Sequence, residues 1–173
     1  TLHLLQIEVT IMNPITNTEN NSKKLKYSFN PQLTPNLTKA QGGQITSGWK
    51  DKEINWEEAQ LTEMVKTTSY LPSKLIDGKK LKKNVEEVYF LTLDFDKGDP
   101  TKDNFIENSK SAKHSWFLHT TVNHQKSVTD ENVPTNPRDK FRVIVPFNRP
   151  VSLDELASMK EELKKRFPTV DPS

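Results

Sequence analysis

VYFLTLDFD, residues 88–96, decides the predicted fold, because it is rich in strong β-formers and is followed by the turn-forming run KGDP at 97–100. Asp94 and Asp96 stand two residues apart at the end of this stretch. Side chains alternate along a strand, so both carboxylates are expected on one face. The stretch therefore predicts a strand that carries an acidic pair at its carboxyl end.

The chain after this strand alternates between helical and extended patterns. In order, the predicted elements are a helix at 101–113, strands at 115–122 and 141–147, a helix at 152–166 and a strand that begins at 169. Thr101 or Asp103 can cap the first helix, and Ser152-Leu153-Asp154-Glu155 is a capping box for the second. The order predicts an α+β fold with a ferredoxin-like (βαββαβ), RNA-recognition-motif-like core.

Right-handed crossovers in such a core place the third strand between the first and the second, and the fourth strand on the other side of the first. The starts of the third and fourth strands and the end of the second then lie beside the acidic pair. The residues expected at this edge of the sheet are Asp94, Asp96, His124, Lys140, Arg142 and Asp171. Three carboxylates with a cationic fringe suit divalent metals that themselves hold phosphates.

Each of these residues also has a simpler interpretation. An Asp-x-Asp pair after a strand is a common turn-forming end, and His124 in a polar loop can be an ordinary surface histidine. Arg142 stands in an otherwise apolar strand, where an unpaired charge would be costly, so it is either a structural ion pair or a phosphate ligand. His114 and His119 are interpreted as a helix-end and a strand residue, and the tryptophans 49, 56 and 116 as core.

The N-terminal half is less regular. Residues 13–50 show no sustained period, which leaves a loop, a partly ordered arm and a substrate-gripping flap all open. A helix is predicted from Trp56 to about residue 68, with Asn55 as its cap. A turn at 75–83 follows and carries four lysines, Lys79, Lys80, Lys82 and Lys83. We divide the chain into an N-terminal α/β extension, residues 1–84, and a catalytic core, residues 85–173.

Composition excludes several classes of protein. The chain of 173 residues has 25 Lys and Arg against 23 Asp and Glu, which is neither histone-like nor polyanionic. The absence of cysteine excludes a disulfide scaffold, a thiol nucleophile and zinc sites built on Cys. No apolar run is long enough to span a bilayer, so we expect no membrane partner and a cytoplasmic protein of a bacterial, archaeal or phage-infected cell.

Four stretches together resemble one known family. They are VYFLTLDFDKGD at 88–99, HTTVNHQ at 119–125, DKFRVIVPFNRPVSLDEL at 139–156 and TVDPS at 169–173. This ordered set is similar to the catalytic domain of the archaeo-eukaryotic primase superfamily, and within it to the primase-polymerase domains of phage, plasmid and mobile-element replication proteins. The chain departs from the family pattern at Val122, where a small polar residue is usual.

The resemblance implies a DNA primase or polymerase that works by two-metal-ion nucleotidyl transfer. Asp94, Asp96 and Asp171 would hold two Mg²⁺ or Mn²⁺ ions, and His124, Arg142 and Lys140 would bind the nucleoside triphosphate. Single-stranded or primed DNA template would follow basic residues such as the lysines at 79–83. We also expect the catalytic core to be truncated at its C-terminus and the native chain to be longer, with a helicase domain in it.

Two other functions fit the same pattern. One is a non-catalytic nucleic-acid-binding or replication-initiator module, although acidic residues on a central strand would repel a phosphate backbone. The other is a metal-dependent nuclease, which uses similar carboxylates but has less need of groups that bind a triphosphate. The enzyme is the interpretation that accounts for the acidic residues and the cations together.

Overall fold

A computed structural model of the chain describes residues 8–12, 24–33, 39–67, 69–97, 100–111, 114–121, 129–130, 133–134, 139–166 and 171–172. These residues form a mixed α+β structure with antiparallel sheets. Its four helices are α1 (Lys39–Gln44), α2 (Glu58–Thr67), α3 (Lys102–Ser109) and α4 (Leu153–Arg166). No helix in this part of the chain is long and apolar enough to cross a membrane.

The chain divides into two compact units. The first unit comprises Thr1–Ile15, Thr92–Val145 and Lys160–Ser173, and the second comprises Thr16–Leu91 and Pro146–Met159. The division differs from the predicted boundary at residue 84, because strands β6 (Val85–Phe95) and β10 (Phe141–Val151) each contribute residues to both units.

The strands of the first unit follow the order β1 (Val9–Met12), β7 (Trp116–Thr120), β10, β6 and β11 (Asp171–Pro172). The pairs β1–β7, β7–β10 and β6–β11 are antiparallel. The predicted neighbours are thus observed, since β10 lies between β6 and β7, and β11 lies on the other side of β6. This order follows from the alternation of helix and strand patterns after residue 88.

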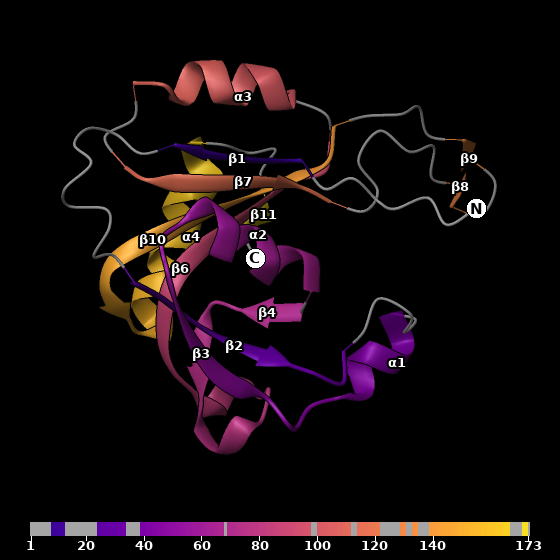
Figure 1. Cartoon of the computed structure of the whole chain (residues 1–173), viewed down its shortest axis with the longest axis vertical. Helices are drawn as coiled ribbons and strands as arrows, with labels where there is room; N and C mark the ends of the chain where they lie inside the picture. The colour runs from indigo at the N-terminus through magenta and orange to yellow at the C-terminus, as the bar shows by residue number, and fades with distance from the viewer. Residues whose placement is uncertain are drawn as a thin grey trace. The chain divides into compact units, whose positions relative to one another are not determined.

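One face of this sheet packs against α3 (Figure 1). Phe105 of α3 lies 5.1 Å from Phe95 and 5.4 Å from Trp116, measured between ring centroids. Leu118, Phe141 and Val143 complete the buried cluster. Thr101 caps the helix as predicted, because its side chain accepts a hydrogen bond from the Asn104 N–H. The helix ends at Ser109 rather than near residue 113.

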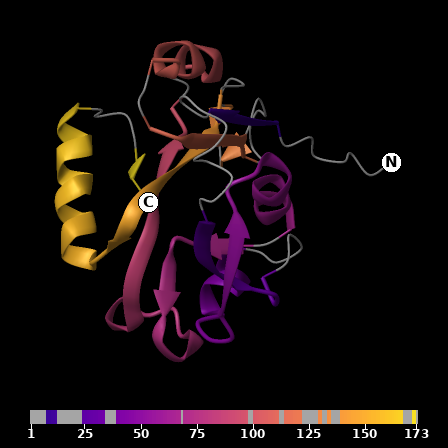
Figure 2. The same ribbon diagram turned by 60° about the vertical axis from the view of Figure 1, so that its left-hand side comes forward.

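Helix α4 begins at the predicted capping box. The Glu155 carboxylate accepts a hydrogen bond from the Ser152 N–H at 2.9 Å, and the Ser152 hydroxyl accepts one from the Glu155 N–H at 3.2 Å. Strand β10, which leads into this helix, continues to Val151 rather than ending at residue 147 (Figure 2). The predicted strand ended before Pro150, which lacks an N–H, yet the fixed φ of proline is compatible with an extended backbone.

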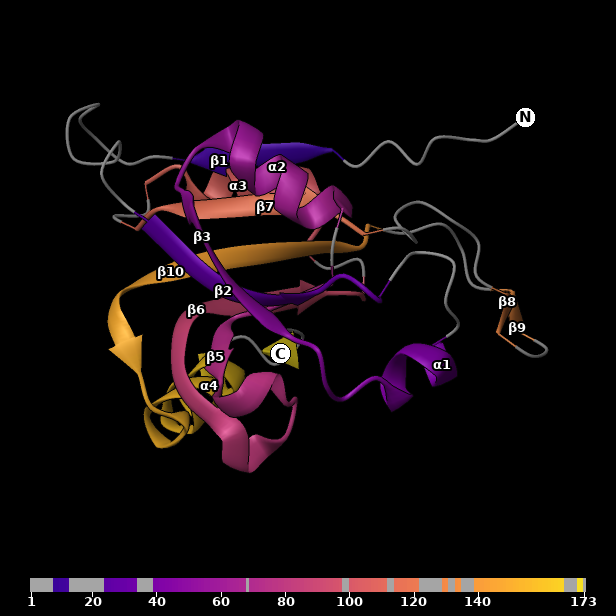
Figure 3. The same cartoon turned by 60° about the horizontal axis from the view of Figure 1, so that its bottom comes forward.

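The second unit contains a three-stranded antiparallel sheet in the order β3 (Lys50–Asn55), β2 (Lys24–Asn30) and β4 (Ser69–Leu71). Its three strands are labelled in Figure 1, and β2 and β3 also in Figure 3. Leu25 and Tyr27 of β2 are buried, as are Leu61 and Met64 of the predicted helix α2. The sequence analysis missed strand β2, although its sequence, KLKYSFN, alternates polar and apolar residues at the period of a strand. Asn55, the expected cap of α2, is instead the last residue of β3.

Short elements complete the second unit. Strand β5 (Ser73–Leu75) pairs with the first half of β6, and the 3-10 turns η2 (Ile76–Gly78) and η3 (Lys82–Asn84) follow it. Gly78 has a positive φ of 59°, and an added Cβ would lie 2.4 Å from the Trp49 carbonyl oxygen. The turn therefore requires glycine, both for its backbone angle and for the close approach of Trp49. Between β7 and β10 lie the two-residue strands β8 (Thr129–Asp130) and β9 (Val133–Pro134), which pair with each other.

The three tryptophans are buried, as predicted. Trp49, Trp56 and Trp116 are 6%, 3% and 4% exposed. Their indole Nε1 atoms have no hydrogen-bond partner among the described residues. The rings therefore serve as apolar core rather than as exposed platforms.

Candidate functional site

Asp94 and Arg142 form a two-point ion pair on neighbouring strands of the first unit. Arg142 Nε lies 2.5 Å from Asp94 Oδ1, and a terminal guanidinium nitrogen donates to Oδ2 at 2.9 Å. The side chains are 32% and 16% exposed, so the pair is partly screened from solvent. Planar guanidinium and carboxylate groups match in this geometry, which fixes the orientation of both. The sequence left Arg142 as an ion pair or a phosphate ligand, and in the structure it forms the ion pair.

Asp171 stands opposite Asp94 in the sheet. The two residues are register partners in the antiparallel pair β6–β11, followed by Pro172 opposite Leu93. The topology predicted from the sequence brings their backbones together, although most of a domain separates them along the chain. Two acidic positions therefore lie side by side at this edge of the sheet.

His119 lies on β7, the strand beside β10, and was not predicted to be part of the site. It is the register partner of Arg142 and is only 7% exposed. Burial lowers the pKa of His119 to about 4, and the Arg142 charge acts in the same direction, whereas the Thr120 carbonyl and Asp94 oppose it. Nδ1 lies 3.1 Å from the Thr120 carbonyl, which only accepts, so Nδ1 carries the proton of the neutral ring.

A signal for His119 was present in the sequence. Trp116 and Leu118 belong to the face packed on α3, so the alternation along β7 places Phe117 and His119 on the opposite face. The ion pair with Arg142 shows that Asp94 lies on this face as well. Pairing the predicted strand end at 122 with the predicted start at 141 would place His119 opposite Ile144, so the pairing with Arg142 comes from the observed register.

Of the other residues predicted at this edge of the sheet, the structure describes Asp96 and Lys140. Asp96 directly follows β6 and is exposed. Lys140 is half-buried at the start of β10, and its carbonyl accepts a hydrogen bond from the Thr121 N–H at 3.0 Å. His124 and Val122 lie outside the described residues, as does the side chain of Asp171.

The lysine turn belongs to the second unit, whereas Asp94 and Arg142 belong to the first. The four lysines are exposed, and Lys80 Nζ lies 5.5 Å from the centroid of the Trp49 ring. The Lys80 N–H also donates to the Thr46 carbonyl at 2.6 Å. The turn is therefore held in place by contacts of its backbone and of one lysine, and it presents the remaining ammonium groups to solvent.

The described side chains contain no group of three or more His, Asp or Glu that could hold a metal ion. That set of side chains includes Asp94 and Asp96 but not Asp171 and His124. The donors at this edge are carboxylate oxygens, which are the ligands that Mg²⁺ and Mn²⁺ prefer. In donor type, the predicted acidic set suits a hard divalent cation.

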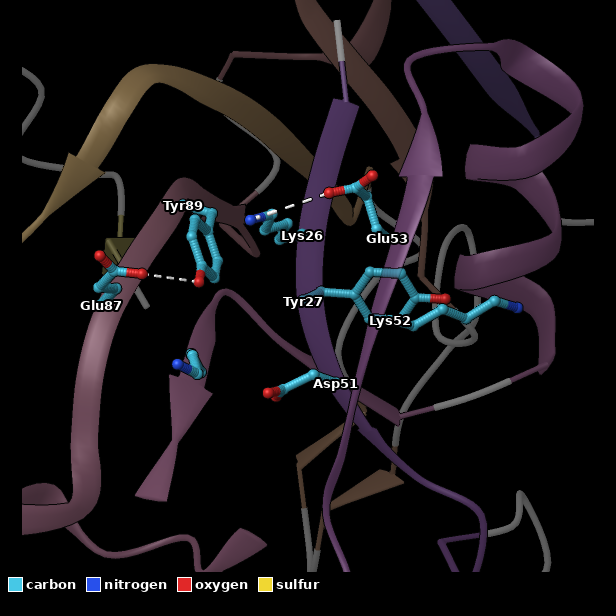
Figure 4. A pocket seen from close by; sticks show the side chains of 8 residues that line it. Lys26, Tyr27, Asp51, Lys52, Glu53, Glu87 and Tyr89 are labelled. Atoms are coloured by element: carbon cyan, nitrogen blue, oxygen red, sulfur yellow. Dashed lines mark hydrogen bonds and ion pairs between the residues drawn. The ribbon is translucent and has the colours of Figure 1, made fainter. Parts of the chain in front are cut away.

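A pocket of about 330 Å³ lies in the second unit, lined by residues of β2, β3, β5 and β6 (Figure 4). Its lining carries charges of both signs, with Lys26, Lys52 and Lys74 against Asp51, Glu53 and Glu87. Burial raises the pKa of Tyr89, and the hydrogen bond that its hydroxyl donates to Glu87 at 2.9 Å acts in the same direction. The sequence did not reveal this pocket because β2 went unpredicted.

The first unit thus brings together Asp94, Arg142, His119 and the backbone position of Asp171. Asp96 directly follows β6, and Lys140 directly precedes β10. The lysine turn is in a different unit. Comparisons with models of known protein families, with curated proteins and with solved structures found no match to this chain.

Proposed function

We propose that the chain is the catalytic domain of a primase-polymerase, which adds nucleotides to a 3′-hydroxyl, or starts a primer, on a DNA template. The observation that carries the proposal is the register of Asp171 opposite Asp94. Two acidic residues so far apart in sequence have no structural need to be neighbours, because like charges on opposed positions repel. A shared cation is a reason for such a pair.

The order of the strands supports the proposal. Strands β7, β10, β6 and β11 follow the sequence of neighbours that a ferredoxin-like, RNA-recognition-motif-like core requires. Helix α3 connects β6 to β7, and α4 connects β10 to β11. We propose that these elements form such a core and that the acidic pair stands at the end of its central strand.

The ion pair leaves room for a metal at Asp94. Each carboxylate oxygen has two lone pairs, so Asp94 can accept both hydrogen bonds from Arg142 and still offer an oxygen to a cation. Asp96 is exposed and presents a second carboxylate. Asp94, Asp96 and Asp171 would hold Mg²⁺ or Mn²⁺. When bound, two such ions would activate the attacking hydroxyl and stabilise the leaving pyrophosphate.

The cations of β10 would position the nucleotide. Arg142 fixes the orientation of the Asp94 carboxylate through its two-point contact, and Lys140, two residues earlier, adds a charge just before the same strand. His119 is uncharged at neutral pH, so it adds no repulsion toward Arg142. We propose that Lys140 and Arg142, together with His124, bind the triphosphate.

The proposal is tested by metal-dependent nucleotide binding and by primer extension. Asp94→Asn and Asp96→Asn keep the size of each side chain and remove its charge. We expect each to reduce primer extension by more than about 100-fold, since metal ions contribute several kcal/mol of transition-state stabilisation. Calorimetry should show Mn²⁺-dependent binding of a deoxynucleoside triphosphate to the wild type and not to the double variant Asp94→Asn/Asp96→Asn.

Asp103→Asn is the matched control. Asp103 is an exposed carboxylate in the first turn of α3, in the same unit. This variant should retain the activity of the wild type. Near wild-type extension by Asp94→Asn would refute the assignment of the acidic residues.

A second function is favoured by one observation. Arg142 contacts both oxygens of Asp94, which is also what a purely structural ion pair requires. A non-catalytic nucleic-acid-binding or replication-initiator module on the same fold would use the pair in that way. Single-stranded DNA binding that is equal in the wild type and the double variant, without any metal-dependent nucleotide binding, would favour this module.

A further inference from the structure

A small pocket of about 180 Å³ in the second unit is lined by cations and aromatic rings and by no carboxylate among the described residues. Its lining includes Lys24, Lys26 and Arg149, the rings of Tyr89 and Phe147, and the amide of Asn148. These residues come from β2, β6 and the end of β10. Pockets for drug-sized ligands start at about 300 Å³, so this one has room for a single ring system.

The cations of this pocket form exposed ion pairs with two glutamates, Glu53 and Glu155. Lys24 Nζ lies 2.8 Å from Glu53, and a terminal nitrogen of Arg149 lies 2.6 Å from Glu155. The Lys24 and Arg149 side chains are 61% and 67% exposed. An exposed lysine–glutamate pair is weak in water, so an incoming phosphate can compete with Glu53 for Lys24. Arg149 contacts both oxygens of Glu155, at 2.6 and 3.4 Å, and is held more firmly.

The aromatic rings are held in position. The Tyr89 hydroxyl donates to Glu87 at 2.9 Å, and Lys26 Nζ lies 5.8 Å from the centroid of the Tyr89 ring (Figure 4). Phe147 is half-buried, so part of its ring is accessible. Asn148 is exposed and offers both a donor and an acceptor for the edge of a base. The rings can therefore stack on a base, the Asn148 amide can bind its edge, and the cations can bind its phosphates.

We propose that this pocket binds one nucleotide of a single-stranded DNA segment. The base stacks on Tyr89 or Phe147, and the flanking phosphates contact Lys24, Lys26 and Arg149. The neighbouring pocket of about 330 Å³ shares Lys26 and Tyr89 with this one. This inference does not depend on the proposed catalytic activity, because none of these residues takes part in the chemistry at Asp94.

Fluorescence anisotropy with a labelled twelve-nucleotide oligo(dT), in EDTA, tests the proposal without metal or turnover. Lys24→Gln/Lys26→Gln removes two exposed charges with little risk to folding. It should reduce the slope of log K against log salt concentration by about 1.4, since each phosphate contact on a single strand contributes about 0.7. Tyr89→Leu should weaken binding by about 10-fold or more, and Tyr89→Phe, which keeps the ring, should bind like the wild type.

Lys164→Gln/Lys165→Gln is the matched control for charge. These lysines are exposed on α4 and each pairs with a glutamate three residues earlier, at 4.0 Å and 3.9 Å. The control should bind like the wild type. An equal loss in both double variants, or unchanged binding in both Lys24→Gln/Lys26→Gln and Tyr89→Leu, would overturn the proposal. Thymidine monophosphate that competes as well as the oligonucleotide would overturn the assignment to a strand.

Discussion

Acid should weaken the fold through His119, and the size of the effect follows from its burial. Its pKa falls from 6.5 to about 4 in the folded protein, so between these values the unfolded chain binds the proton more readily than the folded chain. Stability is therefore fully present above about pH 6.5 and is lost as the pH falls toward 4. A difference of about 2.5 pKa units corresponds to about 3 kcal/mol.

His119→Asn isolates this contribution, because asparagine does not titrate and its amide can still donate to the Thr120 carbonyl. The free energy of unfolding is measured by urea titration at several values from about pH 7 to about pH 4, with circular dichroism as the probe. The variant will be less stable by a constant amount, and the wild type should lose about 3 kcal/mol relative to it over this range.

The exposed His114 provides the control. His114→Asn replaces an exposed ring by the same residue, and its curve should run parallel to that of the wild type. Parallel curves for the wild type and His119→Asn would show that the buried ring accepts its proton without cost, and would refute the reasoning.

Two further predictions concern the backbone. Ser152→Ala should destabilise the protein by about 1 kcal/mol in urea unfolding, because the Glu155 N–H loses its hydroxyl partner, whereas Ser152→Thr should not. Gly78→Ala should cost more than about 1 kcal/mol, since the new Cβ would meet the Trp49 carbonyl at a positive φ. Gly43→Ala, where nothing lies within 4 Å, should be neutral or stabilise α1 by up to about 1 kcal/mol, and equal effects at both glycines would contradict the explanation.

The second half of the chain was predictable because its local signals agree with one another. The Thr101 cap and the Ser152–Glu155 capping box both begin helices where expected, and the β-rich run at 88–96 coincides with most of β6. Strand β2 was missed although KLKYSFN alternates at the period of a strand. The alternation does not reveal that its polar residues Ser28 and Asn30 are fully buried, because they rely on distant partners. Ser28 Oγ lies 2.6 Å from the Ser73 carbonyl, and Asn30 donates to the Ser47 carbonyl at 2.8 Å.

The candidate site was predictable where it depends on topology alone. The strand order places Asp171 and Arg142 near Asp94, whereas the exact register of Asp171 opposite Asp94 comes from the structure. Whether Arg142 contacts a carboxylate or a phosphate depends on side-chain geometry, which cannot be derived from the spacing of residues along the chain. The role of His119 depends on its burial, which only the packed sheet reveals.

The two units share strands, so the protein cannot be divided into them by one cut in the chain. Neither unit is a continuous piece of chain, since the boundary passes within β6, within β10 and within α4. A fragment that starts at residue 85 would lack β1, the partner of β7, and β5, the partner of β6. Recombinant halves should therefore expose unpaired strand edges and aggregate, so function is best mapped with point substitutions in the whole chain.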